Sequence, residues 1–412
     1  MNFKPYILTL ALTVASAANG HTAVELTLDQ CVELALENNP ELRTAILEVE
    51  KAKDMKGTAF DAPMTAVTLK QDATDGGGLD NGVSFTQEFE FPTVYVARYK
   101  SLRAEADLRE AEARQSRAAT VQAVTDAYCR LLFFESKCAI LARQDSIYDE
   151  FVHIAAARFD NGESSRLEKL NAVKLFNDNR MTLYQAQSDL LDCRLELQRL
   201  TGVDLDITPA LATNTRLELP PTETELDYYS TTDGIIDLRK IELSDRNASL
   251  AAHEFAPSIA LGATVQALIK SFNPYNVDRQ RFDRGNFMGF EVGISVPLFF
   301  GAQRARWKAA GRSAEIARLD AETRRSAMSS EYSSLINRHK IQSDELNYFE
   351  RQGIRDAEEI NRLARVSYRL GEIGYAEYVQ NLETAAAIRM SYAESLLNYN
   401  ITISRLNYFL SK

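Results

Sequence analysis

Alternating apolar and polar residues predict four β-strands arranged as two pairs. In residues 83–91, Val83 and Phe85 fall on one face of an extended strand, whereas Ser84 and Glu88 fall on the other. The predicted strands are 64–70, 83–91, 258–269 and 287–297, joined within each pair by a turn-rich stretch at 72–78 and a polar loop at 270–286. This pattern fits either a sheet with one face toward lipid or an ordinary half-buried sheet packed on helices.

Each strand pair is followed by a proline and by two long helical segments. The first pair precedes residues 97–161 and 164–201, and the second precedes residues 302–370 and 375–412. At about 1.5 Å per residue, a helix over the first of these segments extends about 95 Å, far more than a globular core needs. The repeated order predicts an internally duplicated, mainly α fold in which each copy holds two strands and a long helical hairpin.

The order of these segments also sets the expected domain boundaries. We expect a signal peptide at 1–20, a first structural repeat at 21–202, a connector rich in Thr, Pro and Asp at 203–235, and a second repeat at 236–412. The first repeat is expected to begin with a helix over 27–56. A signal peptide implies export of the mature chain.

One position interrupts the apolar seam of the last helix. Apolar or small residues recur there with alternating spacings of four and three, as in a coiled coil, except at Arg389. The other seam residues are Tyr378, Leu382, Ala385, Tyr392, Leu396, Tyr399, Ile403, Leu406 and Leu410. The seam predicts that this helix packs against a neighbour along its whole length.

Composition excludes several classes of function. The formal net charge is −11 and no cluster of Lys and Arg stands out, so no nucleic-acid partner is expected. No stretch after the first twenty residues is apolar enough to form a membrane-spanning helix, so any membrane crossing is expected to use a β-barrel. No nucleophile motif, phosphate loop or metal-ligand spacing is present, and we therefore expect no enzyme, no cofactor and no metal site.

The four cysteines allow two interpretations. Cys129 and Cys193 lie at equal distances along the chain from Asn161, at the expected tip of the first hairpin. Equal arms of an antiparallel hairpin place the two at one height, where a disulfide is geometrically allowed. The alternative is that all four cysteines are reduced and buried, as free cysteines commonly are.

The chain resembles the TolC-type outer membrane efflux proteins, also called outer membrane factors. Residues 26–30 (LTLDQ) and 34–42 (LALENNPEL) resemble the N-terminal signature of that family, and Pro297-Leu298-Phe299 with Gly301 and Arg304 resembles its strand-to-helix junction. Two further segments, Arg158-Phe159 with Gly162 and Tyr368 with Gly371, resemble the two hairpin tips of that family. The phenylalanine-rich strands are similar to the branch that works with heavy-metal pumps.

The resemblance implies a trimeric α/β-barrel channel in the outer membrane of a Gram-negative bacterium. Each protomer is expected to give four strands to one barrel and its helices to a tunnel in the periplasm. The expected partners are a second and third copy of the chain, outer membrane lipid, a periplasmic adaptor protein and an inner membrane efflux transporter. The chain itself is expected to be a passive exit duct in efflux or type I secretion.

The resemblance also implies a gate of carboxylates near the tips. The sixth residue after the tip glycines is Glu168 in one copy and Glu377 in the other, and Gln380 occupies a position where some relatives have Asp. Three copies of Glu377 would form a ring that favours cations. Glu168 has a competing explanation, because residues 165–168 (SRLE) have the form of a helix capping box.

Arginines near the tips suggest a latch, and one other class of protein fits the pattern. Arg158, Arg166 and Arg369 are candidates for salt bridges between protomers that keep the tips closed, although exposed ion pairs often contribute little. A soluble periplasmic coiled-coil adaptor or scaffold also explains the helices. It does not require the amphipathic strands.

Overall fold

The computed structural model describes residues 24–73, 79–210, 215–219, 225–268 and 287–411. The predicted signal peptide, part of the turn-rich stretch at 72–78 and the whole polar loop at 270–286 lie outside the described residues. The described chain forms two compact units, and both structural repeats contribute to each of them. The tip unit contains the chain up to Asn39, Ala123–Leu217 and Gln342–Ile401, and the sheet unit contains Pro40–Gln122, Glu218–Ile341 and the chain from Thr402.

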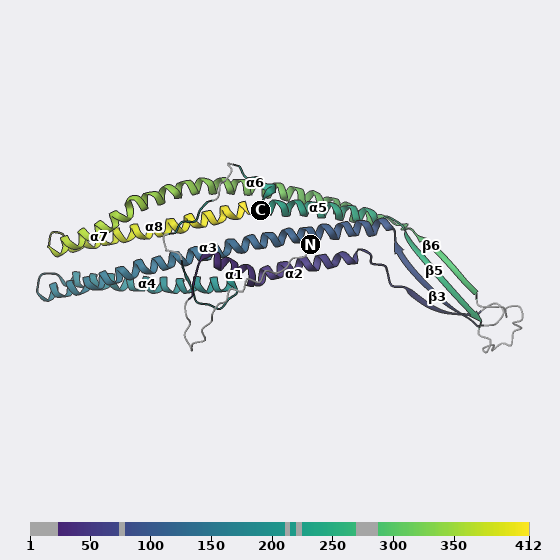
Figure 1. The fold of residues 1–412 in the computed structure, drawn as a ribbon, viewed down its shortest axis with the longest axis horizontal. Coiled ribbons are helices and arrows are strands. Elements are labelled where there is room, and N and C mark those ends of the chain that lie inside the picture. The colour runs from purple at the N-terminus through teal and green to yellow at the C-terminus, as the bar shows by residue number, and fades with distance from the viewer. Residues whose placement is uncertain (1–23, 74–78, 211–214, 220–224, 269–286, 412) are drawn as a thin grey trace. The chain divides into compact units, whose positions relative to one another are not determined.

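The chain is predominantly helical, as the sequence predicted (Figure 1). The helices are α1 (Leu28–Asn38), α2 (Pro40–Met55), α3 (Pro92–Asp160), α4 (Arg166–Thr201), α5 (Thr232–His253), α6 (Gly301–Tyr348), α7 (Ile354–Arg369) and α8 (Tyr375–Leu410). The strands are β1 (Val24–Leu26), β2 (Ala66–Ala73), β3 (Leu79–Glu90), β4 (Ile207–Pro209), β5 (Ser258–Leu268) and β6 (Phe287–Ser295). Two 3₁₀ turns (Lys56–Ala59 and Tyr228–Ser230) and one π-helical turn (Phe349–Gly353) complete the described elements.

The predicted helix over 27–56 is wrong in one respect, because it is two helices. Thr27 caps α1 through a capping box with Gln30, as expected for that position. Pro40 then ends α1 and starts α2, since proline lacks the amide hydrogen that a helix interior needs and suits a helix start. The side chain of Asn39 at this junction is buried, and its Nδ2 donates to the carbonyl of Leu200 at 3.0 Å.

The long segment predicted over 302–370 also differs from a single α-helix. It contains the π-helical turn at Phe349–Gly353 between α6 and α7, whereas α3 in the first copy is one uninterrupted helix of 69 residues. A Cβ added at Gly353 would lie 3.0 Å from Cδ1 of Phe349. Glycine therefore leaves room for the Phe349 ring inside this turn.

The tip unit has apolar clusters along its helices, two of which contain eight or more buried residues. One joins α1, α3, α4 and β4 around Tyr128, whose hydroxyl donates to the carbonyl of Leu26 at 3.0 Å. Beside it, β1 pairs in parallel with β4 of the connector, a contact that the sequence did not indicate. The second cluster lies near the hairpin tips and surrounds Phe151.

The sheet unit contains a four-stranded antiparallel sheet in the order β2-β3-β5-β6 (Figure 1). The register aligns Val67 with Phe85, Phe85 with Ala263, and Ala263 with Phe290, which places these four residues in one row across the sheet. All four strands that the alternation predicted are present, with ends shifted by a few residues. The helical part of this unit has its own core, which includes Tyr332 and Phe409.

Candidate functional site: the two hairpin tips

The first hairpin ends in a Schellman motif at Gly162. The amide of Glu163 donates to the carbonyl of Arg158 at 2.8 Å, and the amide of Gly162 donates to the carbonyl of Phe159 at 2.9 Å. Gly162 has φ +75°, the left-handed conformation that glycine adopts without a steric penalty. Space does not restrict this position, because an added Cβ would meet nothing within 4 Å. Glycine is favoured here only by the left-handed backbone conformation.

The second hairpin repeats this motif at Gly371. The amide of Glu372 donates to the carbonyl of Ser367 at 2.9 Å, the amide of Gly371 donates to that of Tyr368 at 3.2 Å, and Gly371 also has φ +75°. The two tips are therefore structurally equivalent. Residues at the same distance from the two glycines can be compared directly.

The helices that return from the two tips begin differently. The hydroxyl of Ser165 accepts the amide of Glu168 at 3.2 Å and caps α4. The equivalent residue before α8 is Gly374, which has no side chain to cap with. Only the serine half of the proposed capping box is seen, because the Glu168 carboxylate lies toward Arg158 instead, with 3.9 Å between Oε1 and Nη1.

Glu168 belongs to a cluster that joins the two hairpins within one chain. Its side chain is only 17% exposed, and its Oε1 is buried without a hydrogen bond. Nη1 of Arg158 also donates to the hydroxyl of the buried Tyr368 on α7 at 3.2 Å. This hydrogen bond raises the pKa of Arg158, whereas burial raises the pKa of the Tyr368 hydroxyl. Glu168 is thus placed to hold Arg158 between the hairpins.

Stacked aromatic rings reinforce the same contact. Tyr368 and Tyr378 lie with ring centroids 4.4 Å apart and an interplanar angle of 7°, and Phe151 stacks on Tyr375 at 5.0 Å. Each such pair contributes about 0.5–1.5 kcal/mol beyond the area that it buries. The sequence interpretation used Tyr378 only as a seam residue and Tyr368 only as part of a tip motif. The aromatic residues gathered near both tips were the available signal for this cluster.

Glu377, unlike Glu168, is exposed to solvent and forms no ion pair within the described part of its chain. It lies in the first turn of α8. Its carbonyl accepts from Nδ2 of Asn381, and the exposed Gln380 likewise uses its carbonyl, for the hydroxyl of Thr384. The carboxylate of Glu377 therefore remains available to a group outside its own chain.

Arg369 already has a partner within its own chain. Its Nη2 lies 2.8 Å from Oε1 of Glu150 on α3, and both side chains are about half exposed. Arg158 is engaged as described above, and Arg166 is exposed at the start of α4. The structure thus pairs two of the three arginines proposed as a latch between protomers with residues of the same chain.

The four cysteines are free thiols in this structure, so the Cys129–Cys193 bond is not present in it. Cys129 is buried, and burial raises the pKa of its thiol to about 12. Burial also raises the pKa of the Cys31 thiol to about 11. Thiols with such pKa values hold their proton at neutral pH and are unreactive.

Within the described part of the chain, no three His, Cys, Asp or Glu side chains are grouped to hold a metal ion. Among the same residues, no helix has both the length and the apolar character needed to cross a membrane.

Comparison with known proteins shows which family the chain resembles. Residues 31–203 match the family model described as outer membrane efflux protein. The chain is also 25% identical over 306 residues to the alkaline protease secretion protein AprF of Pseudomonas aeruginosa, an alignment that covers 66% of this chain and 60% of that protein. The chain is thus similar to the outer membrane efflux proteins over residues 31–203. The resemblance inferred from the tips and the N-terminal signature is confirmed.

Solved structures of outer membrane channels share the fold of this chain. The CmeC channel of Campylobacter jejuni is 15% identical, with a TM-score of 0.78 and coverage of 96% of this chain and 90% of that one. The MtrE channel of Neisseria gonorrhoeae is 16% identical, with a TM-score of 0.75 and coverage of 96% and 93%. The prediction that the protein is not an enzyme agrees with this family. A branch specific for heavy metals stays a prediction, because these similar scores do not single out one branch.

Proposed function

We propose that this protein is a homotrimeric channel of the outer membrane whose helices form a tunnel in the periplasm. The channel is a passive exit duct, and an inner membrane transporter supplies the energy. A periplasmic adaptor docks at the hairpin tips. The observation that carries the proposal is the sheet of the sheet unit, which has an exposed apolar face, a polar face and two unpaired edges.

The apolar face of the sheet is exposed where a soluble protein would cover it. On β6, the side chains of Phe290, Val292 and Ile294 are 79%, 73% and 70% exposed. Val67 and Leu69 on β2 are exposed as well, and the register continues the row from Val67 to Phe290 through β3 and β5. A contiguous exposed apolar surface of this kind marks contact with lipid or with another protein.

The opposite face of the same strands is polar. Between the apolar residues of β3 and β6 lie Ser84, Glu88 and Glu291, which occupy alternate positions and therefore the other face. This arrangement is the reverse of a soluble sheet, whose polar face meets solvent and whose apolar face is covered. It matches a barrel wall with lipid outside and a water-filled lumen inside.

The two edges of the sheet explain why three copies are needed. β2 and β6 each pair on one side only, and long unpaired edges invite pairing with another chain. Four strands cannot enclose a conducting lumen, whereas three copies supply twelve. The three longest strands have 9 to 12 residues, which fits the length that a tilted strand needs to cross a bilayer.

AprF is named as a secretion protein, and CmeC and MtrE are named as outer membrane channels, so both efflux and type I secretion fit the family. The alternative, a soluble periplasmic adaptor, does not explain why the apolar face of the sheet is exposed.

Fractionation of cells that express the protein tests the proposal directly. We expect the protein with the outer membrane, as a trimer on a detergent gel that dissociates on heating. Only a closed assembly in lipid both removes the apolar face of the sheet from water and pairs the backbone groups of its two open edges. Recovery as a monomer in the soluble periplasmic fraction would contradict the channel and favour the adaptor.

Glu377→Gln is expected to weaken cation block of the channel while leaving folding and trimer formation unchanged. Three exposed carboxylates around a narrow opening attract cations, and their removal should weaken block by divalent or trivalent cations from the periplasmic side about tenfold or more. Conductance of the purified trimer in a planar bilayer measures this effect.

Glu168→Gln is the matched control at the equivalent position of the other tip. Because Glu168 lies beside Arg158 within one chain, its substitution is expected to loosen the contact between the hairpins and change cation block little. Unaltered cation block in Glu377→Gln would contradict the carboxylate ring. Glu377 would then be only an acidic residue in the first turn of α8.

A further inference from the structure

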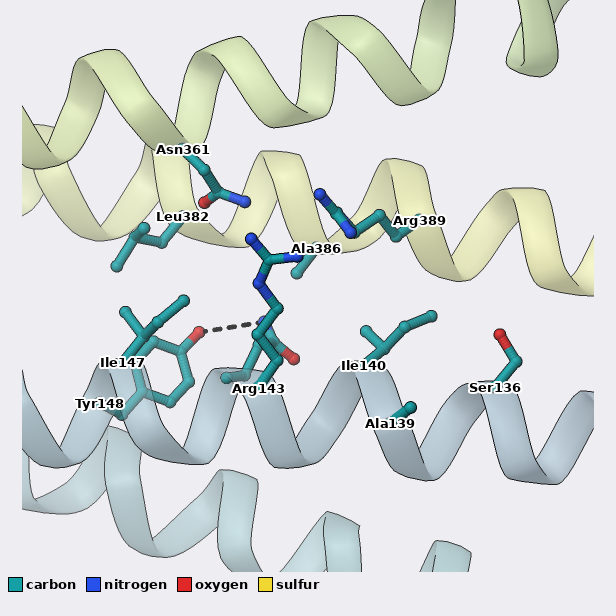
Figure 2. A pocket seen from close by; sticks show the side chains of 11 residues that line it. Ser136, Ala139, Ile140, Arg143, Ile147, Tyr148, Asn361, Leu382, Ala386 and Arg389 are labelled. Carbon is teal, nitrogen blue, oxygen red and sulfur yellow. Dashed lines mark hydrogen bonds between the residues drawn. The ribbon is translucent and has the colours of Figure 1, made fainter. Parts of the chain in front are cut away.

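A cavity of about 230 Å³ lies in the tip unit between α3, α7 and α8 (Figure 2). Arg143 enters it from α3, Asn361 from α7 and Arg389 from α8, and Figure 2 shows these three side chains pointing toward one another. It is separate from the tip residues proposed for the gate. Arg389 is the residue that interrupts the apolar seam of the last helix.

Arg389 occupies a position that the seam reserves for an apolar side chain. Its side chain is only 18% exposed, and its Nε is buried without a hydrogen-bond partner. The acidic partner of its guanidinium, Glu358, lies 3.5 Å away and is 61% exposed, so that ion pair is largely in solvent. A buried guanidinium donor without a partner is unfavourable unless another group accepts from it.

Arg143 increases the positive charge of the cavity. No ion pair or hydrogen bond to its side chain occurs among the described residues, and it faces Arg389 from the opposite wall. Burial, together with the nearby charge of Arg143, lowers the pKa of Arg389. Two guanidinium groups that converge on one space, with several donors unused, form a site for an anion.

The rest of the wall is mostly apolar. Ile140, Ile147, Leu382 and Ala386 line the cavity, and Tyr148 closes one end, where its hydroxyl accepts from Nε2 of Gln144 at 3.4 Å. A cavity of about 150 Å³ is large enough for benzene in another protein. The volume here therefore suits one small ring or a short chain together with a carboxylate.

We infer that this cavity binds a small carboxylate with an apolar body, the carboxylate lying between Arg143 and Arg389 and the body against the apolar wall. The amide of Asn361 supplies a further donor. An inorganic anion would use the arginines but leave the apolar wall uncovered. The site does not depend on conduction, so its test is separate from that of the channel.

Calorimetric titration of the purified protein with benzoate tests the inference. Benzoate should bind, whereas benzamide, which has the same ring without the charge, and acetate, which has the charge without the ring, should bind at least about tenfold more weakly. Equal binding of benzoate and benzamide would overturn the role of the arginines. Equal binding of benzoate and acetate would overturn the role of the apolar wall.

Substitutions locate the site. Arg389→Gln and Arg143→Gln are each expected to weaken benzoate binding about tenfold or more. Arg362→Gln removes an equal charge from an exposed position on α7, where Arg362 pairs with Glu359, and should leave binding unchanged. Benzoate binding that survives in both cavity variants would overturn the inference.

Thermal unfolding without ligand separates binding from folding. Because the two arginines repel one another in the empty cavity, Arg143→Gln should leave the unfolding midpoint unchanged or raise it, while abolishing the rise that benzoate produces in the unsubstituted protein. Arg143 is exposed and its substitution leaves the packing intact, so Arg143→Gln decides the matter even if Arg389→Gln destabilises the helices.

Discussion

Phe290→Arg is expected to reduce sharply the amount of trimer in the outer membrane. Phe290 lies near the middle of β6 on the apolar face and is 79% exposed in the single chain. If that face contacts lipid, an arginine there destabilises the inserted barrel by about 2–4 kcal/mol, which is a large part of the stability of most proteins. The trimer recovered from purified outer membranes, resolved without heating, measures the effect.

The opposite face of the sheet provides the control. Glu88 lies on the polar face of β3 and is exposed, so Glu88→Arg is expected to leave the amount of trimer unchanged and to shift ion selectivity instead. Equal tolerance of arginine at both positions would mean that the sheet is not embedded in lipid. Equal loss at both would indicate a sheet covered on both faces by protein.

Asp237→Ala is expected to destabilise the sheet unit by about 2–3 kcal/mol, because it leaves the buried Tyr228 hydroxyl without its acceptor and removes the buried carboxylate that pairs with the half-exposed Arg324. Asp237 is 2% exposed, accepts the hydroxyl of Tyr228 at 2.5 Å, and accepts Nε of Arg324 at 2.8 Å. The substitution leaves both donors without their acceptor. Burial, together with the same contact, raises the pKa of Tyr228, which therefore remains a donor at all ordinary pH values.

The unfolding midpoint of the purified trimer measures this effect, and the same helix offers a control. Asp245 on α5 pairs with Arg318 at the surface, where both side chains are about half exposed. Asp245→Ala should therefore cost about 1 kcal/mol or less. A midpoint for Asp237→Ala no lower than that of Asp245→Ala would show that the buried cluster does not stabilise the unit.

Local sequence patterns were sufficient for most elements of the fold. Alternation over 83–91 predicted β3, and the segment free of glycine and proline over 97–161 predicted α3, because side-chain period and backbone restrictions act over a few residues. The break at Pro40 was also present in the sequence, and the single helix over 27–56 overlooked it. The left-handed glycines at the tips follow from the same local rules.

Contacts between distant segments were not predictable in this way. The π-helical turn at Phe349–Gly353 depends on how a buried ring packs, and the pairing of β1 with β4 joins the start of the first repeat to the connector. Neither leaves a periodic signal. The two compact units also cut across the repeats, because the long helices α3, α6 and α8 each run through both.

Glu168 and Glu377 show most clearly where local sequence information ends. The sequence determined that both occupy the same position after a left-handed glycine, since that depends only on spacing along the chain. Only the tertiary structure decided that Glu168 lies beside Arg158 and Tyr368 while Glu377 remains exposed. Electrostatic and hydrogen-bond partners depend on distances of a few ångströms between residues that are far apart in the chain, and those distances are set by the packing of the hairpins.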